Sequence, residues 1–182
     1  MIEGKLVNLR AQEMTDLDRA YRWINDREVT EHLSMRYQVS RAAEEEWLQN
    51  RTRRMPTFGD ITFAIETKDG EHIGNTGFHF AHQEDRNASL GVMIGEKEYW
   101  SKGYGTDAII TLLRFGFDEM NLHRVQLSVH DGNDRAKACY RKCGFVEEGR
   151  LREDRFLRGR YIDTIIMGVL RDEFRALHGA GG

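Results

Sequence analysis

The sequence has few of the residues that mark several large classes of protein. Its 182 residues include one proline and two cysteines, Cys139 and Cys143. Two cysteines are too few for a disulfide framework or a zinc site. Their spacing of four on a predicted helix indicates two small buried side chains, so no metal is expected.

Long apolar runs are also missing. No stretch approaches the ~20 apolar residues of a membrane-spanning helix. The first residues lack the basic and apolar segments of a secretory signal. We therefore expect a cytoplasmic protein with no membrane partner.

The charge balance gives no strong field of either sign. Lysine and arginine number 27 against 30 aspartates and glutamates, a net charge of -3, so nucleic acid is not an expected partner. A local run of arginines over residues 150–160 is balanced by acidic residues at 147, 148, 153 and 154, which indicates a solvated β-hairpin.

The length and the 40% hydrophobic content favour one domain over two, expected at residues 1–175 with a frayed tail over 176–182. Periodicity predicts one mixed α/β sheet. The expected strands cover residues 4–9, 61–67, 72–81, 90–95, 124–130, 145–151 and 161–170, and the expected helices cover 15–26, 40–54, 103–120 and 133–143. The polar and aromatic segment 29–40 is a candidate substrate-facing loop.

A glycine turn over residues 100–106, with the sequence WSKGYGT, precedes the third predicted helix. Free backbone N–H groups converge at a helix N-terminus and favour an anion such as a phosphate. Residues 103–108 also fit the dinucleotide fingerprint G-x-G-x-x-A, with Asp131 after the next strand. Residues 96–102 separate the first glycine from the preceding strand and no run of further βα units follows, which disfavours a dinucleotide site.

Two motifs about 30 residues apart resemble one family. Residues 100–105 resemble the pyrophosphate loop of the GCN5-related N-acetyltransferases (GNAT), and residues 133–145 resemble that family's N-x-x-[AS]-x-x-x-Y-x-K-x-G-F element. The stretches 145–149 and 159–163 are similar to the C-terminal strands of its RimJ/RimL branch, which acetylates ribosomal-protein N-termini and polyamines. The resemblance covers residues 6–170.

The resemblance implies a single α/β (α+β) domain with a twisted, mostly antiparallel sheet, helices on both faces and splayed central strands. It also implies acetyl transfer from acetyl-CoA to a primary amine, directly within a ternary complex and without a metal. The amine could belong to a protein N-terminus, a polyamine or another small molecule. A noncatalytic CoA-binding module on the same fold is the alternative. Dimers are common among similar proteins, so a homodimer is a candidate partner, but nothing in the sequence indicates an interface and the oligomeric state stays open.

Site residues follow from the same resemblance. Tyr140 is expected to act as the general acid that protonates the leaving thiolate. The backbone of residues 92–94 is expected to pair with pantetheine, the turn with the pyrophosphate, and Asn133 with the pantetheine arm. The cofactor-binding set is Val92, Met93, Ile94, Trp100, Ser101, Lys102, Gly103, Tyr104, Gly105, Thr106, Asn133, Arg135, Lys137 and Tyr140, with Arg141 a further candidate for the outer phosphates.

The general base is the least determined part of the site. Many relatives carry a glutamate where this chain has Ser89, so another group must take the proton or water must relay it. Glu98 is the named candidate, with Glu96, Glu84 and His79 beside it; for His79 a half-exposed strand histidine is the plainer interpretation. Acidic residues near the first loop, Asp26, Glu28 and Glu31, could attract a cationic acceptor, although ordinary solvated charge is favoured.

Overall fold

The computed structural model describes residues 1–33, 35 and 37–179. The strands are β1 Ile2–Glu3, β2 Val7–Arg10, β3 Asp60–Thr67, β4 His72–His82, β5 Asn87–Ile94, β6 Arg124–His130, β7 Val146–Leu157 and β8 Arg160–Leu170. The helices are α1 Leu17–Asn25, α2 Arg41–Arg53, α3 Tyr104–Asp118, α4 Asp134–Lys142 and α5 Arg171–His178, with 3-10 turns η1 Met14–Asp16 and η2 Lys97–Tyr99. None of the helices in the described ranges is long and apolar enough to cross a membrane.

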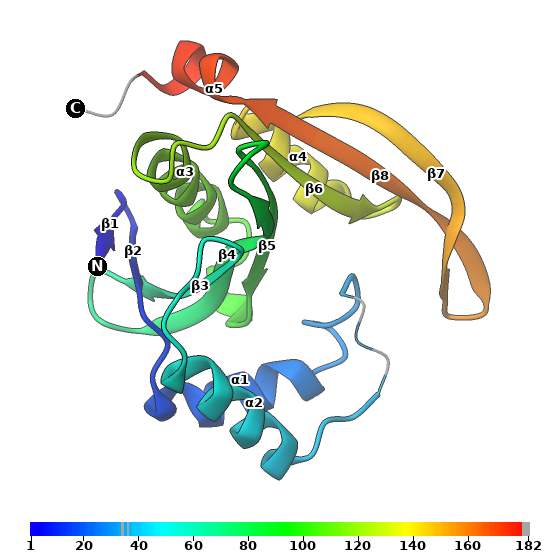
Figure 1. Ribbon diagram of the computed structural model, residues 1–182. Helices are drawn as coiled ribbons and strands as arrows, with labels where there is room; N and C mark the ends of the chain where they lie inside the picture. The colour runs from blue at the N-terminus through cyan, green and yellow to red at the C-terminus, as the bar shows by residue number, and fades with distance from the viewer. Residues whose placement is uncertain (34, 36, 180–182) are drawn as a thin grey trace.

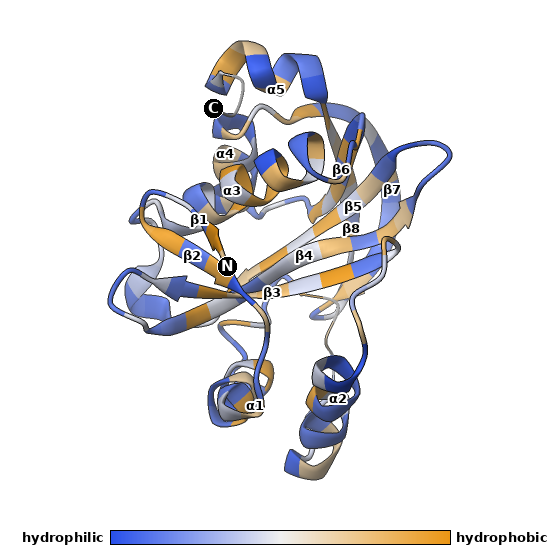
Figure 2. Cartoon of the chain, turned by 60° about the vertical axis from the view of Figure 1, so that its left-hand side comes forward, coloured by the Kyte–Doolittle hydropathy of each residue, from blue (hydrophilic) through white to orange (hydrophobic). Residues whose placement is uncertain are grey.

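The strands form one sheet in the order β1-β2-β3-β4-β5-β6-β8-β7 (Figure 1). Within the described residues the β5–β6 pair is parallel and the other pairs are antiparallel. Figure 2 shows α3, α4 and α5 above the sheet and α1 and α2 below it. The predicted mixed sheet with helices on both faces is therefore confirmed, and the parallel sheet that a dinucleotide fold requires is not formed.

The main core lies between the sheet and α3. The predicted apolar face of α3 is buried, and its members Ile109, Leu112, Leu113 and Phe117 are at most 2% exposed. A Cβ at Gly116 would come within 2.6 Å of the Phe78 ring, so only glycine lets α3 approach β4 this closely. Each buried side chain of this size contributes ~1.5–3 kcal/mol, and together they fix α3 against the strands.

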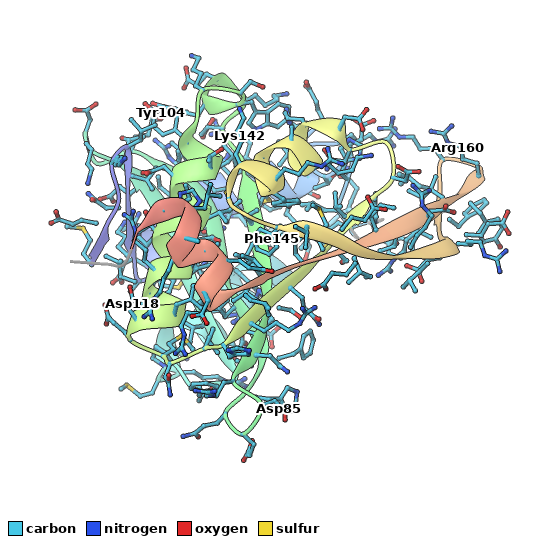
Figure 3. All side chains as sticks on the ribbon, turned by 90° about the horizontal axis from the view of Figure 1, so that it is seen from above. Asp85, Tyr104, Asp118, Lys142, Phe145 and Arg160 are labelled. Carbon is cyan, nitrogen blue, oxygen red and sulfur yellow. The ribbon has the colours of Figure 1, made fainter. Side chains whose placement is uncertain are left out.

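The C-terminal part differs from the expectation. The strand expected to end at residue 151 continues to Leu157, and the β7–β8 hairpin extends from the body of the molecule with Arg160 near its tip (Figure 3). The helix α5 was not predicted. Its Phe174 is buried against Phe117, with 5.3 Å between ring centroids. Residues 176–178 therefore belong to this helix rather than to the expected tail, whose residues 180–182 lie outside the described part.

Candidate active site

The central strands β5 and β6 separate after a short pairing. Their parallel register ends at Ser89 and Gln126. The strand β5 continues to Ile94 along β4, while β6 continues along β8 and turns away (Figure 1). Within the described chain, the edge of β5 over residues 90–94 therefore has no strand beside it. Such an edge can receive the amides of an extended ligand as a further strand would.

The glycine turn brings the N-terminus of α3 to the end of this open edge. Ser101 and Gly103 have φ angles of 59° and 94°, and Gly103 is the N-cap of α3. The first intrahelical bond runs from the Asp107 N–H to the Gly103 carbonyl, at 2.9 Å. The N–H groups of residues 104–106 precede this bond, and the helix dipole adds positive potential there. The turn therefore has the backbone geometry of an anion site, and phosphate binding there stays a prediction.

The turn is fixed by two contacts that the sequence did not indicate. The Trp100 indole N–H donates to the Ile94 carbonyl at 2.7 Å. This carbonyl is therefore already occupied, and a ligand along β5 must pair with other backbone groups. The Asp107 carboxylate accepts hydrogen bonds from the backbone N–H groups of residues 5, 6 and 7 at 3.2, 2.7 and 3.0 Å. These bonds join the N-terminal segment to the first turn of α3.

The first turn of α4 lies against the glycine turn. The Arg135 guanidinium stacks over the Trp100 ring at 4.0 Å from its centroid. The Asn133 side-chain oxygen caps the helix by accepting from the Ala136 N–H at 3.2 Å, so its amide N–H groups are the ones left for a ligand. The Lys137 amine lies 3.1 Å from Asp131 and 2.9 Å from Asp134. Its charge is thus largely paired within the protein.

Tyr140 projects from α4 as a half-buried side chain. Its ring packs edge-on against Phe145 at 6.0 Å, and no hydrogen bond of its hydroxyl is found among the described residues. Burial, together with the neighbouring Cys139 and Cys143, raises the pKa of Tyr140 above its usual value. The phenol therefore holds its proton at neutral pH and can donate it to a stronger base.

The two cysteines connect α4 to the glycine turn. Cys143 is fully buried, whereas Cys139 is half-buried with its Sγ 3.2 Å from the Thr106 Oγ1. The Cys143 thiol also donates to the Thr106 carbonyl at 3.7 Å. The hydrogen bond to Cys139, together with burial, raises the pKa of Cys143. Their role here is packing, as expected for Cys143 and in part for Cys139.

The base candidates lie in different surroundings. Glu98 is exposed in η2 and has no hydrogen-bond partner among the described residues. Glu96 accepts from Arg22 and from the Trp23 indole N–H, the latter at 3.2 Å, so its charge is already paired. Glu84 is exposed in the turn between β4 and β5. His79 places its Nδ1 2.9 Å from an oxygen of Asp60. Glu98 stays a prediction, while Glu96 is poorly suited.

The acidic residues near the first loop are also paired. Lys97 lies 3.0 Å from Asp26 and 2.8 Å from Glu28, and Arg158 lies 2.7 Å from Glu31. The Glu31–Arg158 pair joins this loop to the end of the β7–β8 hairpin. A hollow of about 630 Å³ lies between this loop and the hairpin, and Asn25, Tyr37 and Phe156 are among the residues that line it. The candidate loop, apart from Ser34 and Arg36 outside the described residues, therefore faces a hollow with paired charges.

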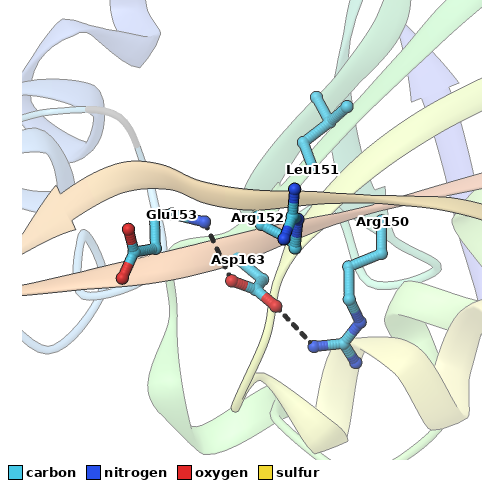
Figure 4. A pocket seen from close by; sticks show the side chains of 5 residues that line it. All are labelled: Arg150, Leu151, Arg152, Glu153 and Asp163. Carbon is cyan, nitrogen blue, oxygen red and sulfur yellow. Dashed lines mark hydrogen bonds and ion pairs between the residues drawn. The ribbon is translucent and has the colours of Figure 1, made fainter.

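A second hollow, of about 730 Å³, lies on the β7–β8 hairpin (Figure 4). Arg150 crosses it and pairs with Asp163 at 2.7 Å and with Asp131 at 2.8 Å. Its lining contains none of the predicted acetyl-CoA residues, and its charged side chains Arg150 and Asp163 pair with each other. Groups of three or more potential metal ligands do not occur within the described residues.

Comparison with known proteins assigns this arrangement to a family. The sequence model of the acetyltransferase (GNAT) domain matches residues 7–146, which include the open edge of β5, the glycine turn and Tyr140. The chain belongs to the GNAT acetyltransferases. This match confirms the resemblance seen in the two motifs.

Individual GNAT relatives match between about half and nearly all of the chain. The spermidine N(1)-acetyltransferase of Vibrio cholerae is 28% identical over 168 residues, which are 92% of this chain and 95% of the relative. A Bacillus subtilis protein named "Putative ribosomal N-acetyltransferase YdaF" is 32% identical over 106 residues, 58% of this chain and 57% of the relative. A crystal structure of the V. cholerae spermidine N-acetyltransferase in complex with CoA and spermine superposes with a TM-score of 0.84 at 28% identity, covering 93% of this chain and 98% of that chain.

These relationships establish the reaction class. This GNAT chain is an N-acetyltransferase that uses acetyl-CoA as cosubstrate and an amine as acceptor. The splayed strands expected from the family are present. The comparisons favour neither the noncatalytic module nor the dinucleotide oxidoreductase.

Proposed function

We propose that acetyl-CoA lies along the open edge of β5 with its pyrophosphate at the start of α3. The observation that carries this proposal is the unpaired edge of β5 leading to a helix N-terminus with free N–H groups. The pantetheine amides pair with the backbone of Val92 and with the Ile94 N–H, since the Met93 carbonyl faces β4 and the Ile94 carbonyl is taken by Trp100. The turn backbone binds the pyrophosphate, and Lys102, Arg135 and Arg141 supply positive charge around it.

Tyr140 is the general acid in this proposal. The acceptor amine attacks the thioester carbonyl directly, within a ternary complex, and the leaving thiolate takes the phenolic proton. The raised pKa of Tyr140 keeps that proton in place until the thiolate develops. Because the hydroxyl has no hydrogen bond among the described residues, it is available to the sulfur.

The acceptor class that fits the site best is the α-amine of a peptide. A polyamine carries several positive charges and is best recognised by free carboxylates, but Asp26, Glu28 and Glu31 are already paired with basic residues. An α-amine with a pKa near ~8 costs only ~1.4 kcal/mol to deprotonate at pH 7, whereas an amine near ~10 costs about 4 kcal/mol. A first loop whose acidic side chains are paired within the protein is better matched to the former.

Polyamines are the second candidate, because relatives that span most of this chain are named spermidine acetyltransferases. The two candidates are separated by mass spectrometry after incubation with acetyl-CoA. The acceptor pool contains peptides with free N-termini, the same peptides with blocked N-termini and a free lysine, and spermidine. Acetylation of the free α-amines alone supports the proposal, and acetylation of spermidine alone overturns the choice of acceptor.

A homodimer also belongs to this proposal. The β7–β8 hairpin extends from the body (Figure 3) and exposes the apolar side chains of Leu151, Phe156 and Tyr161, which suit contact with a second copy. Light scattering of the purified chain tests it, and replacing Phe156 and Tyr161 by serine is expected to give monomers.

A further inference from the structure

A histidine and an aspartate lie opposite each other on the sheet face covered by α2. His79 on β4 is in register with Asp60 on β3, and the Nδ1 of His79 lies 2.9 Å from one Asp60 oxygen. The other Asp60 oxygen accepts from Arg51 of α2 at 2.7 Å, and Arg51 also donates to the Thr62 hydroxyl at 3.1 Å. The His79 side chain remains 36% exposed. The pair is therefore ordered and still reaches solvent.

The geometry fixes which ring nitrogen is available. The Nδ1 that faces the carboxylate carries the proton, so the Nε2 keeps its lone pair. The Nε2 lies over β5, because a Cβ built on Gly91 would be 3.3 Å from it. Gly91 lies within the open segment of β5, and a side chain there would fill the space in front of the Nε2.

The charges around His79 suit proton uptake. On β5 the opposing residues Ser89 and Gly91 are uncharged, so the charged groups facing the ring are Asp60 from β3 and Arg51 from α2. Burial raises the pKa of Asp60, but the hydrogen bonds from Arg51 and His79 outweigh it and lower this pKa. Asp60 is thus a carboxylate at neutral pH and stabilises an imidazolium.

We propose that His79 takes the proton from the acceptor amine and that Asp60 positions it. This inference rests on the proposed function. The N–H bond of the bound ammonium breaks and its proton moves to the Nε2; the freed lone pair forms the C–N bond. The C–S bond then breaks and the thiolate takes a proton from Tyr140. The exposed ring of His79 releases the gained proton to water. The nitrogen is still positively charged after the C–N bond forms, and its second proton passes through solvent to the Tyr140 phenolate.

The cross-strand neighbour of His79 provides a rescue test. His79 and Ser89 are directly paired, and paired positions have Cβ atoms about 4.5–5.5 Å apart. A glutamate at 89 therefore projects into the same volume as the imidazole. Ser89 is also the position where the family resemblance predicts a glutamate. The two sites are alternative places for one base.

The experiment measures kcat and KM across pH for wild type and for His79→Gln, with an acceptor peptide from the pool, and acetyl-CoA affinity by calorimetry. We expect kcat to fall ~10²- to 10⁴-fold, the range for a lost general base, with acetyl-CoA affinity unchanged within twofold. The acidic limb of the kcat/KM profile should disappear. With an acceptor amine that is already unprotonated at the assay pH, kcat of His79→Gln should fall much less.

Matched variants separate chemistry from folding. His82→Gln, at an exposed position on the same strand, should keep the wild-type rate. The double variant His79→Gln/Ser89→Glu should recover at least tenfold of the lost kcat. Asp60→Asn should lower kcat while KM and acetyl-CoA affinity change little, because the imidazole loses the carboxylate that orients it; this readout remains if His79→Gln fails to fold.

The outcomes distinguish this inference from the proposed function. If wild type acetylates no amine, the proposed function fails and this inference fails with it. If wild type is active and His79→Gln matches it, or keeps its acidic limb, only the role of His79 is overturned. A loss of acetyl-CoA affinity that accounts for the lower rate would also overturn it.

Discussion

The replacement Tyr140→Phe tests the chemistry of the site with little risk to the fold. It removes one hydroxyl oxygen from a half-buried ring that packs edge-on against Phe145. No hydrogen bond of that hydroxyl is found in the part of the chain that the structure describes, so no native partner is left unsatisfied. We expect the free energy of unfolding to change by less than ~1 kcal/mol.

The catalytic effect should be much larger. Loss of a general acid lowers the rate ~10²- to 10⁴-fold, which corresponds to about 2.7–5.5 kcal/mol of transition-state stabilisation. Because burial raises the pKa of Tyr140, ionisation of the phenol should not reduce wild-type activity below the usual tyrosine pKa of ~10. The variant should therefore be slower at every pH in the neutral range.

The assay measures the turnover rate from the release of the CoA thiol, and it measures acetyl-CoA affinity by calorimetry. Tyr161→Phe is the matched control, since that ring is 63% exposed near the hairpin tip. A Tyr140→Phe rate within twofold of wild type would refute the acid role. An acetyl-CoA affinity that falls in step with the rate would assign Tyr140 to binding instead.

Further predictions concern stability. Burial raises the pKa of Asp16, but hydrogen bonds from Arg10 and His72 outweigh this effect and lower the pKa. The ionised carboxylate therefore stabilises the folded state above the pKa of ~3.9 that Asp16 has in the unfolded chain, and this stabilisation is lost as the pH falls. Asp16→Asn should lower the free energy of unfolding, measured with urea, by ~3–5 kcal/mol at pH 7. It should also flatten the dependence of that free energy on pH below about pH 4; an unchanged slope against pH there contradicts the prediction. Asp107→Ala should lower the free energy of unfolding by ~1–3 kcal/mol and speed amide exchange at residues 5–7; unchanged exchange there would contradict the role of these bonds. The methyl group of Gly103→Ala has space, but position 103 has a φ of 94° that alanine adopts only with strain. The variant should therefore lose ~1–2 kcal/mol of unfolding free energy and bind acetyl-CoA more weakly in calorimetry. An affinity equal to that of wild type would contradict the role of the turn.

The parts of the fold that local chemistry determines could be predicted from the sequence. Ser40 and Asn133 cap α2 and α4, and both are short polar residues of the kind favoured at helix N-termini, so the starts of these predicted helices are confirmed. The strand β6 spans the predicted residues because its alternating apolar side chains face one core. The glycine turn follows from the positive φ that Gly103 adopts.

The missed features depend on contacts that are distant in sequence. Asp107 binds N–H groups about 100 residues away, and no local pattern marks that role. The Asp60–His79 pair arises from the register of β3 and β4, so the sequence alone could offer His79 only as one candidate beside Glu98. The strand β4 was expected to alternate to residue 81, but its register shifts after His79, and Phe80 turns outward with a φ of 50°.

The gap between β5 and β6 couples cosubstrate binding to the stability of the fold. An open sheet edge is a place where another chain can add, so the empty gap carries an aggregation risk in addition to that of the outer strands β1 and β7. A ligand that fills the gap removes that risk and stabilises the native state by ~2.7 kcal/mol at 100 times its dissociation constant. The lifetime of this enzyme in a cell should therefore follow the supply of acetyl-CoA, and starvation for acetyl groups would lower both its turnover and its abundance.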